Sequence, residues 1–147
     1  MKISEKGIEF IKKHEGCVLK AYQCQAGVWT IGYGHTANVT PGMVISQDEA
    51  DNMLLSDLGW AETAVNGRNL TLNQNQYDAL VSFVFNVGVP AFLKSKLKDI
   101  VMINPDDPQI RTTLLAWNKV QGKESEGLKR RRNDEADLYF GVRHGTI

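Results

Sequence analysis

The sequence predicts a mainly helical α+β fold, in which a small β-hairpin lobe and a helical lobe are joined by a long helix, with a cleft between the lobes. Two observations predict it. Short β-rich runs lie within residues 17–45, whereas the chain from residue 46 onward has apolar residues at helical period. The segment 46–66 keeps that period for about five turns, so at about 1.5 Å per residue it can run down one side of the molecule.

The first predicted helix covers residues 4–15, with Ser4 as its N-cap and a glycine directly after it. Ile8, Ile11 and Glu15 fall at positions i, i+3 and i+7, which lie on one face of a helix. Glu15 therefore continues an apolar stripe. Two interpretations have similar weight: a chemically active acid, or a partly buried carboxylate paired with a basic residue.

A β-hairpin is predicted next. The runs Val18–Tyr22 and Val28–Ile31 are β-rich, and the segment between them ends in a glycine. Gly32 and Gly34 follow at alternate positions, which indicates a close approach of the backbone to another surface.

The rest of the chain is predicted to be helical. Ser46 and Glu49 form a capping box for the helix that ends at Asn66. Weaker capping signals predict further helices from Asn73 to Val87, from Ser95 to about Ile103, from Asp107 to about Asn118 and from about Glu126 to Phe140. The predicted organisation is one domain over residues 1–147, with the small β lobe at about 16–45, the connecting helix at about 46–66 and the helical lobe at about 70–141.

Composition excludes several classes of protein. The chain of 147 residues has 17 basic and 17 acidic residues, and this zero formal charge argues against a general nucleic-acid binder. Hydrophobic residues make up 42% and charged residues 23%, as in globular proteins. No apolar run approaches the roughly 20 residues of a membrane span, and the segment 1–6 lacks the apolar region of a signal peptide. We therefore expect synthesis in the cytosol and no membrane insertion.

Three reactive side chains lie around the hairpin, namely Glu15, Cys24 and His35, and Thr30 lies on its second run. Hydrolysis of a glycosidic bond needs a partly buried carboxylic acid as proton donor, and Glu15 qualifies. Because no acidic residue lies between Glu15 and Asp48, the second group would be Cys24 or Thr30. A Cys24–His35 nucleophile pair is the alternative, weakened because Cys24 lies in a turn and not at a helix start.

Metal or cofactor binding is not expected. A zinc site needs about four nitrogen or sulfur ligands, and the chain has two cysteines and three histidines. Cys17 is expected to be buried and inert, with a disulfide to Cys24 as the alternative.

In the basic run Lys129–Arg132, one or two of four successive cations on a helix must face the protein, and they could supply a partner for Glu15.

These residues resemble the active-site segment of phage-type lysozymes, glycoside hydrolase family 24. The resemblance rests on Glu15-Gly16 followed by Tyr22-x-Cys24-x-x-Gly27-x-x-Thr30-Ile31-Gly32-x-Gly34-His35. The segments 73–88 and 127–135 resemble the central and C-terminal helices of the family, in the same order. The resemblance covers about residues 4 to 141 and implies a lysozyme-like fold.

Members of this family are lysozymes that hydrolyse the β-1,4 bond between N-acetylmuramic acid and N-acetylglucosamine in bacterial peptidoglycan. The resemblance thus implies an endolysin (a muramidase) that acts on glycan strands and causes host cell lysis. Glu15 resembles the general acid, and Thr30 resembles the residue that helps to hold the attacking water. Cys24 stands where Asp is usual. Three roles stay open for it: a thiolate base, a thiolate nucleophile, or a neutral thiol that polarises water.

The resemblance implies further site residues. Substrate contacts are expected from Gly34, His35, Phe85 and Asn86. An ion pair between the lobes is expected from His35 and Asp57. Arg131, with Arg130 as the alternative, is expected to pair with Glu15.

A monomer is expected. By the same resemblance, the enzyme would accumulate in the host cytoplasm and reach the periplasm and cell wall when a separate holin opens the membrane. Two other functions are weighed: a catalytically inactive peptidoglycan-binding protein, and a Cys24–His35 peptidase or amidase of the wall. The first is disfavoured because a protein without activity has no reason to keep Glu15 on an apolar helix face.

Overall fold

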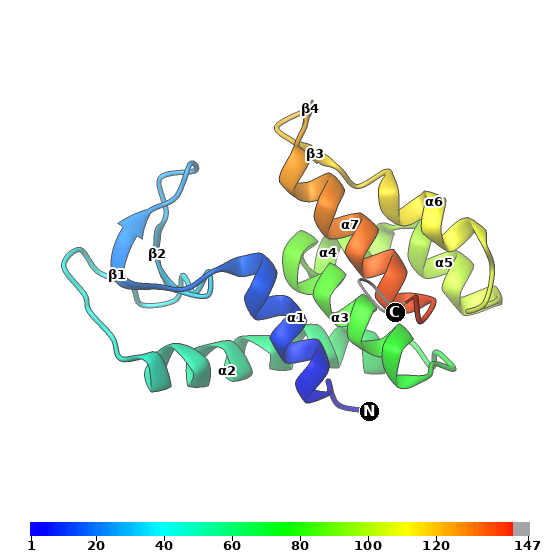
Figure 1. The fold of residues 1–147 in the computed structure, drawn as a ribbon, viewed down its shortest axis with the longest axis horizontal. Coiled ribbons are helices and arrows are strands. Elements are labelled where there is room, and N and C mark those ends of the chain that lie inside the picture. The colour runs from blue at the N-terminus through cyan, green and yellow to red at the C-terminus, as the bar shows by residue number, and fades with distance from the viewer. Residues whose placement is uncertain (143–147) are drawn as a thin grey trace. The chain divides into compact units, whose positions relative to one another are not determined.

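The computed structural model describes residues 1–142, which form two compact units (Figure 1). The units are Glu9–Trp60, and Met1–Ile8 together with the chain from Ala61 onward. The boundaries fall inside two helices, α1 (Glu5–Glu15) and α2 (Gln47–Asn66). The expectation of one catalytic domain stays a prediction.

The unit Glu9–Trp60 contains the predicted hairpin. Strand β1 (Val18–Gln23) pairs antiparallel with β2 (Trp29–Gly32), and Tyr22 lies opposite Thr30. A short segment, 43–45, extends this sheet, because the N–H of Ala21 donates to Met43 O at 2.9 Å. The capping box at the start of α2 is confirmed: Glu49 N–H donates to Ser46 Oγ and Ser46 N–H donates to Glu49 Oε1, both at 3.1 Å. The buried apolar residues of the unit include Ile11, Ile31, Ile45, Ala50, Leu54 and Leu58.

The other unit is built from helices and one very short hairpin. Its elements are α3 (Gln74–Val87), α4 (Val89–Lys94), α5 (Lys96–Ile103), α6 (Gln109–Leu115), β3 (Lys119–Val120), β4 (Lys123–Glu124) and α7 (Glu126–Tyr139). Helix α7 packs against α3 and α6 (Figure 1). The buried side chains include Tyr77, Leu80, Phe83, Phe92, Leu97, Ile110, Leu114 and Tyr139. In residues 1–142, no helix is both long and apolar enough to cross a membrane.

Two parts of this unit differ from the sequence prediction. Helix α6 ends at Leu115 and not near Asn118, because the chain turns into the β3–β4 hairpin. Gln121 (φ +50°) and Gly122 (φ +81°) form the two-residue turn, a conformation that a helix cannot contain. Helix α4 was not predicted at all. The sequence signal for this helix is Pro90, which lies in its first turn, two residues after Gly88.

Candidate functional site

Glu15 is the last residue of α1. Gly16 follows it with φ +67°, and the Gly16 N–H donates to Lys12 O at 3.0 Å, as expected for a glycine that ends a helix. One turn earlier, Lys12 Nζ lies 3.3 Å from Asp51 Oδ1 on α2 and 5.7 Å from the centre of the Tyr33 ring. The carboxyl end of α1 is therefore attached to α2, which fixes the position from which Glu15 extends.

Gln47 completes this attachment. Its Nε2 donates to the Tyr33 hydroxyl at 3.1 Å and to Asp51 Oδ1 at 3.0 Å. The Gln47 amide, together with Lys12, holds the pKa of the Asp51 carboxyl below its usual value, although burial opposes this. The stabilisation from Asp51 is present above its unfolded pKa and is lost as the pH falls through the folded value.

The carboxyl group of Glu15 lies beside Gly34. A Cβ atom built on Gly34 would be 3.4 Å from Glu15 Oε1, which is van der Waals contact. Gly34 is exposed and has φ +83°, a conformation that L-residues rarely adopt. Because Gly34 has no side chain, no Cβ atom of this residue covers that side of the Glu15 carboxyl group.

Gly34→Ala should therefore reduce activity by at least about tenfold, because the methyl group would cover this side of the carboxyl group. Gly42→Ala is the matched control: Gly42 has φ +82°, and nothing lies within 4 Å of its Cβ position. Both variants should lose about 1–2 kcal/mol of stability from the left-handed backbone. Equal activity of the two variants, measured by peptidoglycan digestion below their melting temperatures, would show that the absence of a side chain at Gly34 is unimportant.

Cys24 and Thr30 meet at the turn of the β1–β2 hairpin. Cys24 N–H donates to Val28 O at 3.0 Å, and Gly27 N–H donates to Cys24 O at 2.8 Å, so the turn is closed on both sides. Cys24 is half-buried and is a free thiol. Thr30 is 4% exposed, and its Oγ1 donates to Val28 O at 3.0 Å. Cys24 is thus held next to Thr30 by the backbone of the turn.

Hydrogen-bond donors surround the sulfur of Cys24. The Val28 N–H, then the Ala26 N–H and the Thr30 hydroxyl hold the pKa of the Cys24 thiol below its ordinary value, and burial acts in the opposite direction. The Thr30 hydroxyl has a single proton, so it donates either to Val28 O or to the sulfur. The site can therefore support a thiolate, although the residue is not at a helix start.

His35 follows the hairpin and is tied to α2. Its Nδ1 is 2.7 Å from Asp57 Oδ2, and its Nε2 is 2.9 Å from Ala37 O. Both residues belong to the unit Glu9–Trp60, so the pair joins a loop to a helix within one unit. This corrects the expectation that the pair lies between two lobes. Both ring nitrogens of His35 have partners other than Cys24, which argues against a Cys24–His35 nucleophile pair.

Asp57→Asn should lower the melting temperature. It removes the charged acceptor of a pair whose side chains are 16% and 23% exposed. We expect a loss of about 1 kcal/mol, or about 2–4 °C for a chain of this size. Asp99→Asn is the control, at a carboxylate that is 64% exposed. It should change the melting temperature by less than about 1 °C, because exposed ion pairs contribute little to stability. If both variants melt at the parent temperature, the His35–Asp57 contact has no net value.

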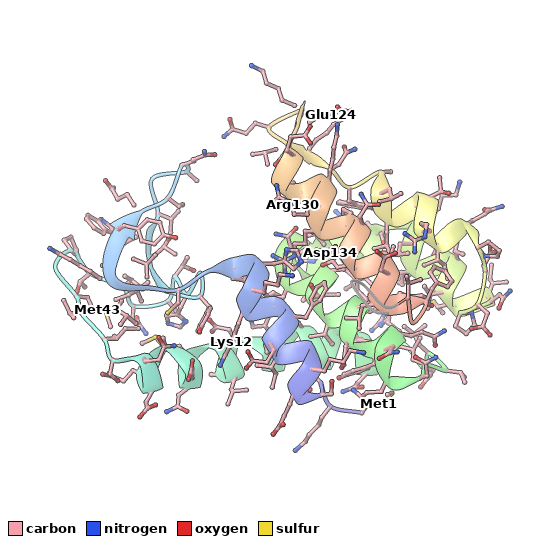
Figure 2. The ribbon with its side chains drawn as sticks, viewed as in Figure 1. Met1, Lys12, Met43, Glu124, Arg130 and Asp134 are labelled. Atoms are coloured by element: carbon pink, nitrogen blue, oxygen red, sulfur yellow. The ribbon has the colours of Figure 1, made fainter. Side chains whose placement is uncertain are left out.

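The other predicted residues lie in the helical unit. Phe85 is partly exposed and Asn86 is exposed, both near the end of α3. On α7, Arg130 is exposed (Figure 2), whereas Arg131 is 4% exposed. Arg131 Nε donates to Glu135 Oε2 at 3.3 Å. Its pairing with Glu15 stays a prediction.

Sequence reasoning missed a buried polar cluster at this place. Arg132 is fully buried, its Nη1 lies 3.1 Å from Glu135 Oε1, and Ser82 Oγ donates to Glu135 Oε2 at 2.6 Å. Burial raises the pKa of the Glu135 carboxyl, while Arg132 and Arg131 act against this. The available signal was the spacing, because Glu135 lies three and four residues after the two buried arginines.

Cys17 corrects another prediction, because it is exposed and not buried. Its Sγ lies 3.9 Å from Gln47 Oε1, and both cysteines are free thiols. Among residues 1–142, no group of three or more His, Cys, Asp or Glu side chains is arranged to hold a metal ion.

The chain is similar to phage lysozymes. The family model described as phage lysozyme matches residues 12–135. An endolysin of Acyrthosiphon pisum secondary endosymbiont phage 1 is 43% identical over 144 residues, which cover 95% of this chain and 98% of that protein.

Solved structures agree with this. An endolysin from Escherichia coli O157:H7 phage FAHEc1 has a TM-score of 0.89 and 35% identity, over 99% of this chain and 98% of its own. The muramidase domain of SpmX from Asticaccaulis excentricus has a TM-score of 0.86 and 36% identity, over 94% and 97% of the two chains. The mainly helical, lysozyme-like fold predicted from the sequence is therefore confirmed.

Proposed function

The chain belongs to the phage lysozyme family, and we propose that it is an endolysin that hydrolyses the β-1,4 bond between N-acetylmuramic acid and N-acetylglucosamine in peptidoglycan. The observation that carries this proposal is the surroundings of Glu15. A partly exposed carboxyl group at the end of an anchored helix lies beside a glycine and in the same compact unit as the Cys24–Thr30 turn.

Glu15 is the proposed general acid. Cleavage of a glycosidic bond needs a proton on the leaving oxygen, and a carboxylic acid that is partly shielded from water supplies it. The contacts of Lys12 with Asp51 and Tyr33 support this role because they hold the end of α1 in place. A positioned acid is effective because it needs no reorganisation at the moment of reaction.

Cys24 and Thr30 are the proposed second part of the machinery. The donors around the sulfur favour its ionised form. A thiolate at this place would either remove a proton from the attacking water or attack the sugar itself. In the first case Thr30 would help to hold the water.

The remaining roles concern the substrate and the cell. Gly34, His35, Phe85 and Asn86 are proposed glycan contacts, and Arg131 is the proposed partner of Glu15. The enzyme is proposed to act as a monomer. It would accumulate in the host cytoplasm and reach the peptidoglycan with the help of a separate holin.

Digestion of purified sacculi tests the proposed function. The parent protein should lower the turbidity of a sacculus suspension and release soluble fragments, and a heat-inactivated sample should not. A protein that binds sacculi but releases no fragments would be the inactive wall-binding protein, and the proposal would be wrong.

A further inference from the structure

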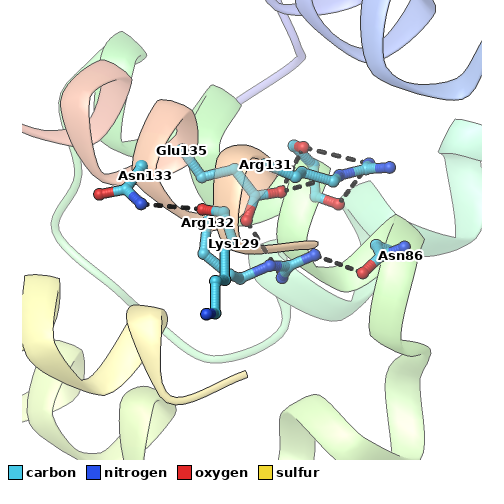
Figure 3. A network of polar contacts seen from close by, with 7 residues as sticks. Asn86, Lys129, Arg131, Arg132, Asn133 and Glu135 are labelled. Carbon is cyan, nitrogen blue, oxygen red and sulfur yellow. Dashed lines mark hydrogen bonds and ion pairs between the residues drawn. The ribbon is translucent and has the colours of Figure 1, made fainter. Parts of the chain in front are cut away.

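A fully buried arginine bonds to an exposed amide near the end of α3. Arg132, on α7, is 0% exposed, and its Nη2 donates to Oδ1 of Asn86 (Figure 3). Its guanidinium carbon is 5.0 Å from the centre of the Phe83 ring, and its Nη1 is 3.1 Å from Glu135 Oε1. The guanidinium group is thus held by a ring, by a carboxylate and by the amide.

The chemistry of the guanidinium group fixes which way the amide of Asn86 points. Arginine has five N–H donors and no acceptor, so only the amide oxygen of Asn86 can face Arg132. The amide nitrogen must then lie on the opposite side, as Figure 3 shows. Asn86 is exposed, so this side chain offers N–H donors to a ligand and keeps its acceptor for the protein.

The cluster behind Arg132 prevents a rearrangement. Glu135 is 0% exposed, and its Oε2 accepts from Ser82 Oγ at 2.6 Å and from Arg131 Nε at 3.3 Å. Arg131 Nη2 also donates to Ser82 O at 3.2 Å. Turning Arg132 away from Asn86 would break contacts in a buried network, where an unpaired polar group is costly.

We propose that Arg132 is a positioning residue that locks Asn86 as a hydrogen-bond donor to the carbonyl oxygen of an N-acetyl group on the glycan strand. The inference rests on the proposed function, because it assigns a group of that substrate. Sugar hydroxyl groups both donate and accept, so they would be bound by either orientation of an amide. A carbonyl oxygen only accepts, as do the ring and glycosidic oxygens, and among these acceptor-only groups of the glycan it is the strongest acceptor for a locked donor.

Asn86→Asp is the most direct variant. The carboxylate keeps the shape of the side chain and still accepts from Arg132, but it presents an oxygen where the amide nitrogen was. We expect KM for soluble peptidoglycan fragments to rise about tenfold or more, with kcat within about threefold and a melting temperature that is not lowered. Asn133→Asp, at an exposed residue on α7, adds the same charge and should keep the parent KM.

Two substitutions test the arginine itself. Arg132→Lys keeps one donor for Asn86, whereas Arg132→Met removes every donor. The Met variant should raise KM about tenfold at unchanged kcat, and the Lys variant should recover much of that loss. A purely structural role would lower stability and kcat without this KM pattern. If neither variant folds, the Asn86→Asp result decides.

The substrate supplies the final test. Partial N-deacetylation of the same fragments should raise KM of the parent by about tenfold and leave KM of Asn86→Asp nearly unchanged, because that variant has already lost the contact. An Asn86→Asp enzyme with the parent KM, or an equal response of both enzymes to deacetylation, would overturn the inference. If the parent does not cleave the fully acetylated fragments, the proposed function is wrong; cleavage with no Asn86 effect rejects only the inference.

Discussion

Glu15→Gln should lower the lytic rate by a factor of about 10²–10⁴, which is the usual contribution of general acid catalysis. The substitution keeps the size and shape of the side chain. An amide, however, is not acidic enough to transfer a proton to the leaving oxygen. The fold should be retained, because Lys12, Asp51 and Tyr33 hold the end of α1 without Glu15. The rate is measured as turbidity loss of membrane-permeabilised Gram-negative cells.

Glu9→Gln is the matched control for this experiment. It makes the same chemical change on the same helix, at a side chain that is 74% exposed and that pairs with Lys12 at 3.7 Å. Its activity should equal that of the parent within about twofold, because surface pairs contribute little. Parent-like activity of Glu15→Gln would reject Glu15 as the acid.

Cys24→Ser should lose most of the activity, and Cys24→Asp should keep much of it, if the thiolate is the base or the nucleophile. A serine hydroxyl stays protonated near neutral pH, whereas an aspartate is ionised. Cys17→Ser is the control, because Cys17 is also a free thiol but is exposed near the end of α1. Full activity of Cys24→Ser would reject both thiolate roles and leave Glu15 with water held by Thr30.

The pH dependence of alkylation should report the lowered pKa of the Cys24 thiol. The Val28 and Ala26 N–H groups lower the pKa of Cys24, so its thiolate should persist to lower pH than a model thiol. The stability that these donors add is complete above the unfolded pKa, about 8.5, and is lost as the pH falls through the lower folded value. Measured on the Cys17→Ser background, the midpoint of alkylation of the folded protein should lie below that of the same protein unfolded in denaturant; an equal or higher midpoint would contradict the stabilisation of the thiolate.

The anomer formed first separates the two thiolate roles. An α product from the β bond means that water attacked from the opposite face of the sugar. A β product means that a covalent thioglycoside formed and was then hydrolysed.

Local signals predicted the frame of the fold because they act within a few residues. Ser46 and Glu49 cap α2 as a capping box predicts, and Ser4 Oγ accepts from Gly7 N–H at 3.1 Å at the start of α1. The glycine after Glu15 ends α1 in the left-handed conformation. Each of these helix-end contacts involves only residues close together in the chain, so it can be predicted from the sequence.

The β3–β4 hairpin and the end of α6 could not be predicted in the same way. Leu114 and Trp117 fit a helical pattern, but Trp117 packs edge-on against Phe83 of α3, with ring centres 5.4 Å apart. This contact is between residues far apart in the chain. The end of the helix is therefore set by this packing contact together with the Gln121–Gly122 turn.

The basic run on α7 illustrates the limit for the site. A helix with four successive cations must bury one or two of them, and the structure buries Arg131 and Arg132 but not Arg130. Their anion, Glu135, lies on the same helix, three and four residues further along the chain. Only the packing of α7 against α3 makes it a buried partner.

The central claim is that the chain is a muramidase, and the new chain end formed in purified peptidoglycan tests this most directly. Digested material is reduced with borohydride, hydrolysed and analysed for reduced sugars, and free amino groups are counted in parallel. We predict that N-acetylmuramic acid appears at the new reducing ends, with no gain of free amines. Release of free amines without new reducing ends would identify a peptidase or amidase and would contradict the assignment.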